Sequence, residues 1–516
     1  MDTSDTFEVI IIGMGPVGLS MANLLGKRGI SVTLIDKEKG PLSFPRAIHG
    51  DDETLRIFDA MGLGDQIRDI ISPFKEMEMV DADGHILTSI VLDQRSGSPK
   101  LPTDYWFFQP ELEEVLETGL ERYSDLTPYR GWEAIGCEES GNGFLIEIQE
   151  VESGRNLFLQ ANWLIGCDGG RSWVRSLMQV EMKSLRFDQS WIVIDTLVEE
   201  EEQKLLPQNH QQICDPNRPA TYVPGVGKHR RWEFMLGPKE SRLPIDELKP
   251  LSLELLSYYV DVNKVEIIRI APYTYHALLA KKWRKSRMFI AGDAAHQMPP
   301  FLGQGMCTGI RDADNLSWKL AEVIKGNREE DILDTYQKER YHHTVQLTRG
   351  AIMLGKIIQS SNSFISGVRN WVFKNVLSNK LLLQEVQNKV SNRADYKTYY
   401  KGYIGKHKFL SGTLFPYFEM HDAFSMENSS SDNYLGESWT VLARDPLPCS
   451  NKPNDMSLLC LNPPSGLWTS FQGNSDIIEE WFDRRGVDFL IIRPDKYIYE
   501  AGKSSQWREE QISLSN

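Results

Sequence analysis

Residues 13–18 read Gly-Met-Gly-Pro-Val-Gly, and these residue types at this spacing suit the binding of a dinucleotide. Gly13 permits a tight turn, Gly15 lets the backbone approach a pyrophosphate, and Gly18 allows close packing of a helix. The helix predicted after the glycine turn would offer its free N–H groups and its positive dipole end to the phosphates. A buried strand is predicted before the segment and a helix after it, so we interpret it as a nucleotide site rather than a structural turn.

An acidic residue, Asp36, ends the next predicted strand and can accept hydrogen bonds from an adenosine ribose. Lys37 follows it and is included in the site, with an ordinary exposed position as the alternative. The contacts predicted at this end of the site are therefore Gly13, Gly15, Pro16, Val17, Gly18, Asp36 and Lys37.

A second informative segment, Gly292-Asp293-Ala294-Ala295-His296, lies far along the chain and continues through Pro299-Pro300 to Gly303-Gln304-Gly305-Met306. With the first segment, it implies that the chain leaves the nucleotide and returns to it near residue 300. A cofactor that is bound at both ends must be long and buried. This favours FAD over a nicotinamide cofactor, which must bind and leave in each cycle. Because only one glycine fingerprint is present, we expect NADH or NADPH to dock transiently.

The elements that must position these residues are predicted from apolar patterns. Strands at 8–12 and 31–35 flank a helix, and strands at 163–166 and 288–291 run into the Cys167-Asp168-Gly169 and Gly292-Asp293 loops. Loops at the carboxyl ends of parallel strands bind the ligands of open α/β folds. Segments between about 180 and 280 are rich in aromatic and branched residues and predict an inserted antiparallel sheet.

The predicted class is therefore α/β (α+β), with a Rossmann-like domain, an inserted antiparallel sheet and a further C-terminal unit. The predicted boundaries are 1–180 with 280–345 for the FAD-binding domain, 181–279 for the substrate-binding sheet, 346–405 for a helical connector and 406–516 for the C-terminal domain. Within the last, 428–433 is predicted to be a polar loop, because it contains no core-forming residue.

These motifs resemble the signatures of the group A FAD-dependent aromatic hydroxylases. The likeness rests on the glycine segment, Cys167-Asp168-Gly169, and the stretch from Gly292 to Leu320, and it covers nearly the whole chain. The 3-(3-hydroxyphenyl)propionate hydroxylase branch is the most similar, given residues 230–236 and the long C-terminal unit. That unit resembles a thioredoxin-like domain without its C-x-x-C pair, which implies a structural or dimer-forming role.

The resemblance also implies residue roles. Asp293 would bind the flavin ribityl chain, Pro300 would lie beside the isoalloxazine, and Gly305 and Met306 would begin a helix facing the flavin N1–C2=O edge. The further contacts that it implies are Arg46, Gln109, Asp168 and Gly303.

The implied reaction is an NAD(P)H-consuming hydroxylation of a phenolic or heteroaromatic substrate by molecular oxygen, through a flavin C4a-hydroperoxide. A phenol reacts faster as its phenolate, so a base or proton relay is expected. His49, Tyr222 and His276 are candidates by location, and packing roles are the alternative for each. Two other functions stay open: tailoring or inactivation of a larger polycyclic natural product or antibiotic, and a flavin-binding sensor without turnover.

Composition and charge also limit the partners and the location that we expect for this protein. The formal net charge of -15 argues against a nucleic-acid partner. No apolar run approaches a membrane span, and the acidic N-terminus lacks the basic start of a signal peptide. Six scattered cysteines predict a reduced, cytoplasmic protein. No metal site is predicted, because His296 has no partner at ligand spacing and is better explained as a loop-bracing residue. A homodimer is possible on the resemblance alone.

Overall fold

We describe the protein from a computed structural model. The residues that the structure describes are 5–91, 100–360, 362–375, 398–421, 428–449, 456–462, 466–471 and 475–509. The predicted connector lies partly outside them, since 376–397 are not described. The chain forms two compact units, which are residues 1–313 with 344–391, and residues 314–343 with 392–516.

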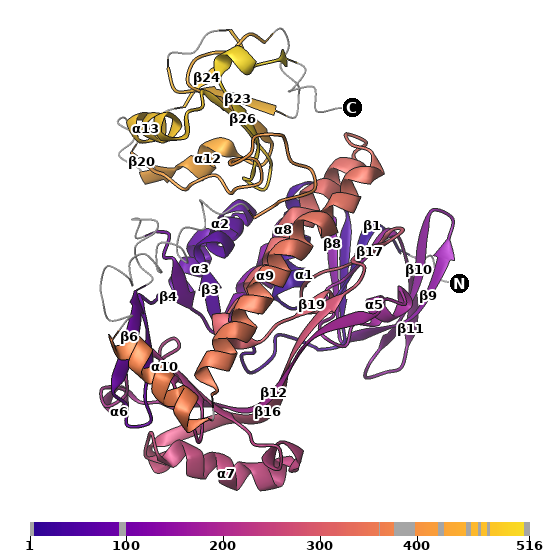
Figure 1. The fold of residues 1–516 in the computed structure, drawn as a ribbon. Helices are drawn as coiled ribbons and strands as arrows, with labels where there is room; N and C mark the ends of the chain where they lie inside the picture. Colours follow the sequence, from indigo (N-terminus) through magenta and orange to yellow (C-terminus); the bar gives the residue numbers. More distant parts are fainter. Residues whose placement is uncertain are drawn as a thin grey trace. The chain divides into compact units, whose positions relative to one another are not determined.

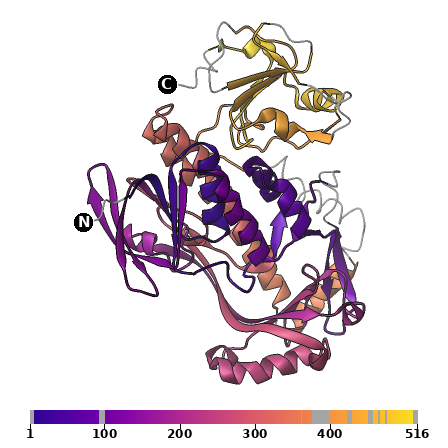
Figure 2. The same ribbon diagram turned by 180° about the vertical axis from the view of Figure 1, so that it is seen from behind.

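The first unit contains the predicted Rossmann-like sheet, with strand order β17-β18-β11-β1-β2-β8. Its five strands from β18 to β8 are parallel neighbours, and β10 and β9 extend β11 as an antiparallel ladder. Helix α1 packs on this sheet, as the view from behind shows (Figure 2). The elements are β1 (Asp5–Ile12), α1 (Pro16–Lys27), β2 (Val32–Asp36), β8 (Leu126–Arg130), β9 (Trp132–Ser140), β10 (Gly143–Glu150), β11 (Asn156–Gly166), α5 (Trp173–Leu177), β17 (Arg284–Lys285) and β18 (Met288–Ile290).

Parallel pairing brings the predicted motif loops together. Ile12 pairs with both Ile35 and Gly166, and Gly166 pairs with Ile290. The carboxyl ends of β1, β2, β11 and β18 therefore meet at one edge of the sheet. Asp36 ends β2 there, and the loops that follow β1, β11 and β18 carry the glycine turn, Asp168 and Asp293.

The inserted sheet is also present, in the order β19-β16-β12-β15-β14-β13-β5-β6, and all its pairings are antiparallel except β13 with β5. The long strands β12 and β16 run together toward α7, which lies across one face (Figure 1). Trp232 and Phe234 pack there against Leu248 and Leu256 of α7. The elements are β5 (Glu76–Val80), β6 (Ile86–Val91), β12 (Met182–Val198), α6 (Glu200–Gln203), β13 (His210–Ile213), β14 (Ala220–Val223), β15 (His229–Met235), α7 (Ile245–Ser257), β16 (Val265–Ala280) and β19 (His296–Gln297).

A small three-stranded sheet, β3-β7-β4, and several helices complete the first unit. They are β3 (His49–Asp51), α2 (Asp52–Met61), α3 (Gly64–Ile70), β4 (Ser72–Pro73), β7 (Asp104–Trp106), α4 (Gln109–Thr118) and α10 (Ser363–Asn375). Two long helices, α8 (Gly305–Ile324) and α9 (Thr335–Ile358), run through both units.

The second unit holds a mixed five-stranded sheet, β24-β23-β22-β25-β26, whose first three strands are parallel and whose last pair is an antiparallel hairpin. This agrees with the α/β class predicted for a thioredoxin-like unit. The polar loop predicted at 428–433 is wrong, because β21 and α12 occupy it and Ser431 and Asp432 are buried. The elements are β20 (Glu419–His421), β21 (Asn428–Ser430), α12 (Ser431–Leu435), β22 (Trp439–Ala443), β23 (Met456–Cys460), β24 (Thr469–Ser470), α13 (Ser475–Arg485), β25 (Phe489–Ile492) and β26 (Ile498–Gly502).

Candidate functional site

The glycine turn has the geometry that its sequence predicts. Gly13 has φ +104°, and a Cβ there would lie 2.4 Å from the Cys167 carbonyl oxygen. A Cβ at Gly18 would lie 2.0 Å from the Gly13 oxygen, so close packing requires glycine at both positions. In contrast, a Cβ at Gly15 would meet nothing within 4 Å. Gly15 is the N-cap of α1 and has no side-chain cap, which leaves the first N–H groups available to a ligand.

Asp36 fastens the end of β2 to this turn. Its Oδ2 accepts the Met14 N–H at 2.6 Å and its Oδ1 accepts the Glu38 N–H at 2.9 Å. The side chain is half-buried, whereas Lys37 is exposed. The structure therefore brings Asp36 to the glycine turn and leaves Lys37 at the surface.

Arg46 and Gln109 lie together, although they are far apart in the sequence. The Gln109 Oε1 accepts the backbone N–H groups of Arg46 (2.8 Å) and Ala47 (2.7 Å). From β15, the Arg231 guanidinium donates to the carbonyls of Pro45 (2.6 Å) and Arg46 (3.1 Å). Two elements thus hold the Arg46 backbone while its side chain stays exposed.

Sequence reasoning missed Arg231 and its partner Asp195, which are both buried and 2.7 Å apart. Arg269 lies 3.6 Å from the other Asp195 oxygen and also donates to the Pro45 carbonyl. The sequence did hold a signal for this pair, because each residue is a charged residue within an otherwise apolar strand. Buried charges are retained only when they are paired, so two such residues indicate an ion pair.

Asp168 caps the short helix α5, since its Oδ2 accepts the N–H groups of Trp173 (2.7 Å) and Val174 (3.1 Å). Burial raises the pKa of its carboxyl group. Its adjacent Gly169 adopts φ +76°, which turns the chain sharply after β11.

The segment that begins at Gly292 packs directly on the glycine turn at residues 13–18. A Cβ on Gly309 of α8 would lie 2.5 Å from Val17 Cγ2 and 3.1 Å from the Gly292 Cα. A Cβ on Gly292 itself would lie 3.0 Å from the same Val17 methyl group. The chain therefore returns near residue 300 to the start of α1, and glycines make the approach possible.

Asp293 follows β18 and its side chain is exposed, yet desolvation by the surrounding protein raises the pKa of its carboxyl. The nearby charges of His296 and Arg46 act in the opposite direction on that pKa. His296 is only 1% exposed and its Nε2 lies 2.6 Å from the accepting Asp312 carboxylate, which agrees with a loop-bracing role.

The loop from Pro300 to Met306 leads into α8. Gly303 adopts φ +63°, and its carbonyl oxygen lies 3.1 Å from the Nδ1 of His49. Pro300, Gly305 and Met306 are half-buried, and a Cβ on Gly305 would have no neighbour nearer than 3.9 Å. Phe301 lies between this loop and the inserted sheet, with its ring 5.9 Å from that of Trp191.

The three candidate bases are in different environments. His49 lies beside the Gly303 loop. Tyr222 lies on the face of the inserted sheet that packs against α7, and burial raises its pKa to about 12. His276 is exposed and bonded to Asp188 at 2.5 Å. The structure brings only His49 to the predicted flavin loop.

A ring cluster that sequence reasoning missed surrounds His49. The His49 ring is 5.7 Å from both Phe74 and Trp106, the last two are stacked at 3.9 Å, and Trp106 lies 5.5 Å from His210. These rings come from four separate segments, so no spacing in the sequence links them.

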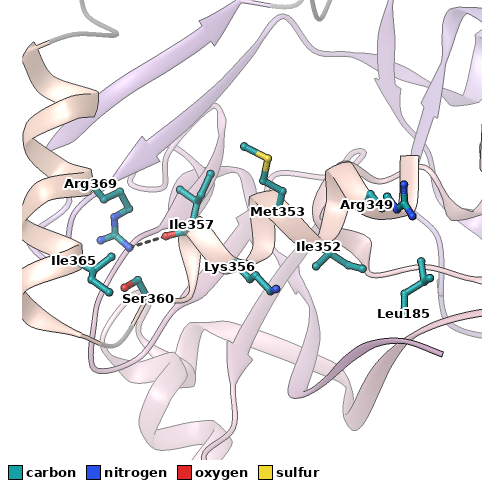
Figure 3. Close-up of a pocket in the computed structure, with 9 residues that line it drawn as sticks. All are labelled: Leu185, Arg349, Ile352, Met353, Lys356, Ile357, Ser360, Ile365 and Arg369. Carbon is teal, nitrogen blue, oxygen red and sulfur yellow. Dashed lines mark hydrogen bonds between the residues drawn. The ribbon is translucent and has the colours of Figure 1, made fainter. Parts of the chain in front are cut away.

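A cavity of about 650 Å³ opens beside α9 and α10 (Figure 3), and its lining includes no residue of the glycine turn. Apolar side chains form most of its wall, and Arg369 is anchored there by donating to the backbone carbonyls of Ile357 and Ile358. The lining residues are Leu185, Arg349, Ile352, Met353, Lys356, Ile357, Ser360, Ile365 and Arg369.

A parallel α/β sheet with a glycine turn, a second motif packed on that turn and an inserted antiparallel sheet together define a dinucleotide-binding enzyme fold. The family comparison then gives the identity: residues 6–351 match the FAD binding domain family, and the chain belongs to that family. It is a group A FAD-dependent aromatic monooxygenase.

Known relatives cover the whole length of the chain. A 3-(3-hydroxy-phenyl)propionate/3-hydroxycinnamic acid hydroxylase of Mycobacterium sp. (strain JLS) is 30% identical over 100% of this chain and 92% of its own. A probable NADH-specific resorcinol 4-hydroxylase of Rhodococcus jostii (strain RHA1) is 29% identical over 96% of this chain and 92% of its own.

Among solved structures, the flavin-dependent monooxygenase PieE matches with TM-score 0.78 and 17% identity over 99% of both chains. The p-nitrophenol 4-monooxygenase PnpA of Pseudomonas putida DLL-E4 matches with TM-score 0.68 and 21% identity over 75% of this chain and 98% of its own. These likenesses agree on the fold.

The residues fit FAD on two observations made above: Gly15 borders open space at the start of α1, and Asp293 exposes its side chain beside the buried residues Gly292 and Ala294. Among the described residues, no helix has the length and apolar character needed to cross a membrane.

Proposed function

We propose that this chain hydroxylates a small phenolic substrate with molecular oxygen, using FAD and NADH or NADPH. The observation that carries the proposal is the packing of Gly292 and Gly309 on Val17, because it joins the two halves of one extended cofactor site. The proposed FAD contacts are Gly13, Gly15, Pro16, Val17, Gly18, Asp36, Lys37, Arg46, Gln109, Asp168, Asp293, Pro300, Gly303, Gly305 and Met306.

The flavin, when bound, supplies the redox and oxygen-activating chemistry. The protein contributes binding, orientation and exclusion of water. The start of α1 would hold the pyrophosphate and Asp36 the adenosine ribose, whereas Asp293 would hold the ribityl chain. The N–H groups at the start of α8 would stabilise negative charge on the flavin edge. Trp191 and Phe301 are apolar walls that would keep water from the reacting ring.

The substrate class is proposed from the names of the relatives. One is named for a 3-hydroxyphenyl acid and another for resorcinol, so both names describe a phenol with a second substituent meta to the hydroxyl group. We therefore propose a meta-substituted phenol for this chain. The proposed domains are those expected from the sequence, with the ring held between the FAD-binding domain and the sheet at 181–279.

The test is substrate-stimulated oxidation of NADH and NADPH by the purified, FAD-loaded protein. We expect a bound flavin spectrum and faster oxidation with resorcinol or 3-(3-hydroxyphenyl)propionate than without them, coupled to a hydroxylated product. If none of a panel of phenols accelerates oxidation while flavin is bound, the protein is a flavin-binding sensor instead. If only polycyclic phenols do so, the natural-product function replaces the proposed one.

We also propose a cytoplasmic homodimer. The thiols of Cys137, Cys167, Cys214 and Cys460 are free, which suits a reducing compartment. Exposed apolar residues on α10, including Phe364 and Trp371, offer surface for a second copy. Light scattering after gel filtration tests the dimer, and the monomeric mass would contradict it.

A further inference from the structure

The cavity beside α9 and α10 has cations in its wall and no acidic residue. Arg349, Lys356 and Arg369 line it, and its other lining residues are Ser360 and apolar side chains. Figure 3 shows Arg349 and Arg369 toward opposite ends of the lining, with Lys356 between them. Within the described parts of the chain, none of these three cations forms an ion pair. A ligand in the cavity would therefore meet positive charge that no bonded carboxylate neutralises.

Arg369 is the most unusual of the three cations, because it is only 7% exposed. Its guanidinium donates to four neutral acceptors, which are the carbonyl oxygens of Ile357, Ile358 and Cys214 and the side-chain oxygen of Asn370. A guanidinium carries five N–H groups, so one N–H on Nη2 has no acceptor among the described residues. Buried charges are normally paired, and Arg369 therefore has both the charge and the free donor that an anionic ligand requires.

The surroundings do not supply the missing negative charge. Burial raises the pKa of the Cys214 thiol to about 11, and the charges of Arg369 and Asp81 act on that pKa in opposite directions. However, Asp81 forms no ion pair with Arg369, and its Oδ1 already accepts two backbone N–H groups. Residues 340–384 contain six Lys or Arg residues and no Asp or Glu, in a chain whose formal net charge is -15. The positive charge is therefore concentrated at this part of the chain.

The rest of the cavity suits an apolar chain. Leu185, Ile352 and Ile357 contribute apolar wall, and the volume of about 650 Å³ is typical of a site for a small molecule. Met353 and Ile365 also line the cavity and are 66% and 55% exposed, so a ligand can enter from solvent. The complementary ligand has an apolar body and one negatively charged end.

Helix α9 lies between this cavity and the loop at 300–303. A Cβ on Gly350 or on Gly355 would lie 3.4 Å or 2.6 Å from side chains of that loop. Ile352 and Lys356 are four residues apart, so they share the face of α9 that lines the cavity. The cavity and the predicted flavin loop thus contact different sides of one helix.

We propose that this cavity is a second ligand site, separate from that of FAD, for an amphiphilic monocarboxylate such as a free fatty acid. The carboxylate accepts the unused Arg369 N–H and lies in the field of Lys356, while the alkyl chain lies along the apolar residues of α9. The site requires neither a phenol nor a nicotinamide, so this inference is independent of the proposed function.

The test is isothermal titration of the FAD-loaded full chain with decanoate at pH 7, below the concentration at which decanoate forms micelles. Decanol has the same chain without the charge, and decyltrimethylammonium has the opposite charge. We expect one decanoate per chain, bound at least tenfold more tightly than decanol, and no binding of the cation. Flavin absorbance after gel filtration with decanoate should show that FAD stays bound.

Variants place decanoate in the cavity. Ser360→Trp fills the space near Arg369 and should abolish binding, whereas Lys356→Gln should weaken it about threefold. Neither side chain makes a hydrogen bond within the described residues, so both variants should fold. Arg369→Met should weaken binding at least tenfold, with thermal unfolding as the check that α9 and α10 stay packed. The matched control is Lys374→Gln, at an exposed lysine of α10 outside the lining, and should bind decanoate as wild type does.

Three results would overturn the inference. They are decanoate binding no tighter than decanol, a folded Ser360→Trp variant that binds decanoate normally, and release of FAD in proportion to decanoate bound. A further arm uses vesicles of phosphatidylcholine with phosphatidylglycerol, which should not sediment the chain. Sedimentation with these vesicles but no binding of monomeric decanoate would make this face a membrane-docking surface and would also overturn the inference.

Discussion

Asp312 Oδ2 lies 2.6 Å from His296 Nε2 and, through the same oxygen, 3.1 Å from the Gly292 backbone nitrogen. A single carboxylate on α8 therefore holds both ends of the turn that presents Asp293. All of these groups except Asp293 are buried. The geometry of the turn at Gly292–His296 thus depends on Asp312, which lies outside that segment.

Asp312→Ala removes this acceptor and should leave His296 and the Gly292 N–H without their partner. Breaking a buried charged hydrogen bond costs about 3–5 kcal/mol of the free energy of unfolding, and we expect FAD affinity to fall at least tenfold. Urea unfolding and flavin fluorescence titration measure the two effects. Asp246→Ala, at an exposed ion pair on α7, is the control and should change neither. Wild-type FAD affinity in Asp312→Ala would refute the bracing role.

Gly13→Ala should abolish FAD binding, because the new Cβ would lie 2.4 Å from the Cys167 carbonyl and the backbone is held at φ +104°. Gly84→Ala is the matched control, since Gly84 has φ +80° and open space around its Cβ position. A left-handed conformation alone costs about 1–2 kcal/mol, so this variant should lose some stability and keep its flavin. Flavin absorbance after gel filtration checks both. Full flavin content in Gly13→Ala would contradict the assignment.

Arg231→Met should loosen the backbone that carries Arg46, because it removes donors to the carbonyls of Pro45 and Arg46 and leaves Asp195 buried beside Arg269 alone. We expect a loss of about 3 kcal/mol in the free energy of unfolding and weaker FAD binding. Arg218→Met, at a partly exposed pair with Glu240, should cost about 1 kcal/mol or less. Equal losses in the two variants would contradict a special role for Arg231.

Glu339 is the centre of a buried charge cluster in the second unit. Its Oε2 accepts from Lys319 (2.7 Å) and Arg493 (2.9 Å), and its Oε1 accepts the Tyr403 N–H at 2.8 Å. Burial alone would raise the pKa of Glu339, but the charges of Arg493 and Lys319 lower it to about 2. The Glu339 carboxylate on α9 therefore lies between two cations, which are Lys319 on α8 and Arg493 directly after β25.

The sign of the pH dependence follows from that lowered pKa. The folded value of about 2 lies below the usual 4.5, so the stabilisation is complete above about pH 4.5 and is lost as the pH falls toward 2. A difference of this size corresponds to about 3 kcal/mol. Glu339→Gln should therefore be less stable than wild type at pH 7, and the gap should narrow by pH 3. Urea unfolding at both pH values measures it, with exposed Glu480→Gln as the control. A gap that is independent of pH would contradict the linkage.

Much of the fold was predictable because local patterns carry it. The apolar runs and the glycines placed β1, α1, β2, β18 and the start of α8 close to their observed bounds. The segment at 428–433 was mispredicted, because Ser431 and Asp432 are buried through tertiary packing that polar composition cannot reveal. Tyr222 was selected as a candidate base because it lies in the inserted sheet. Side chains alternate between the two faces along β14, and this alternation directs Tyr222 toward α7.

The sequence by itself determined the cofactor class, because glycine spacing and strand-end acids are local requirements for holding a dinucleotide. Only the tertiary structure decided which side chains meet. His49 reaches Asp104 and Gly303 because β3 pairs with β7 and α8 folds back toward β3. His210 joins them from a different sheet. The environment of an imidazole depends on burial and on partners distant in sequence, so these contacts became visible only when the chain was folded.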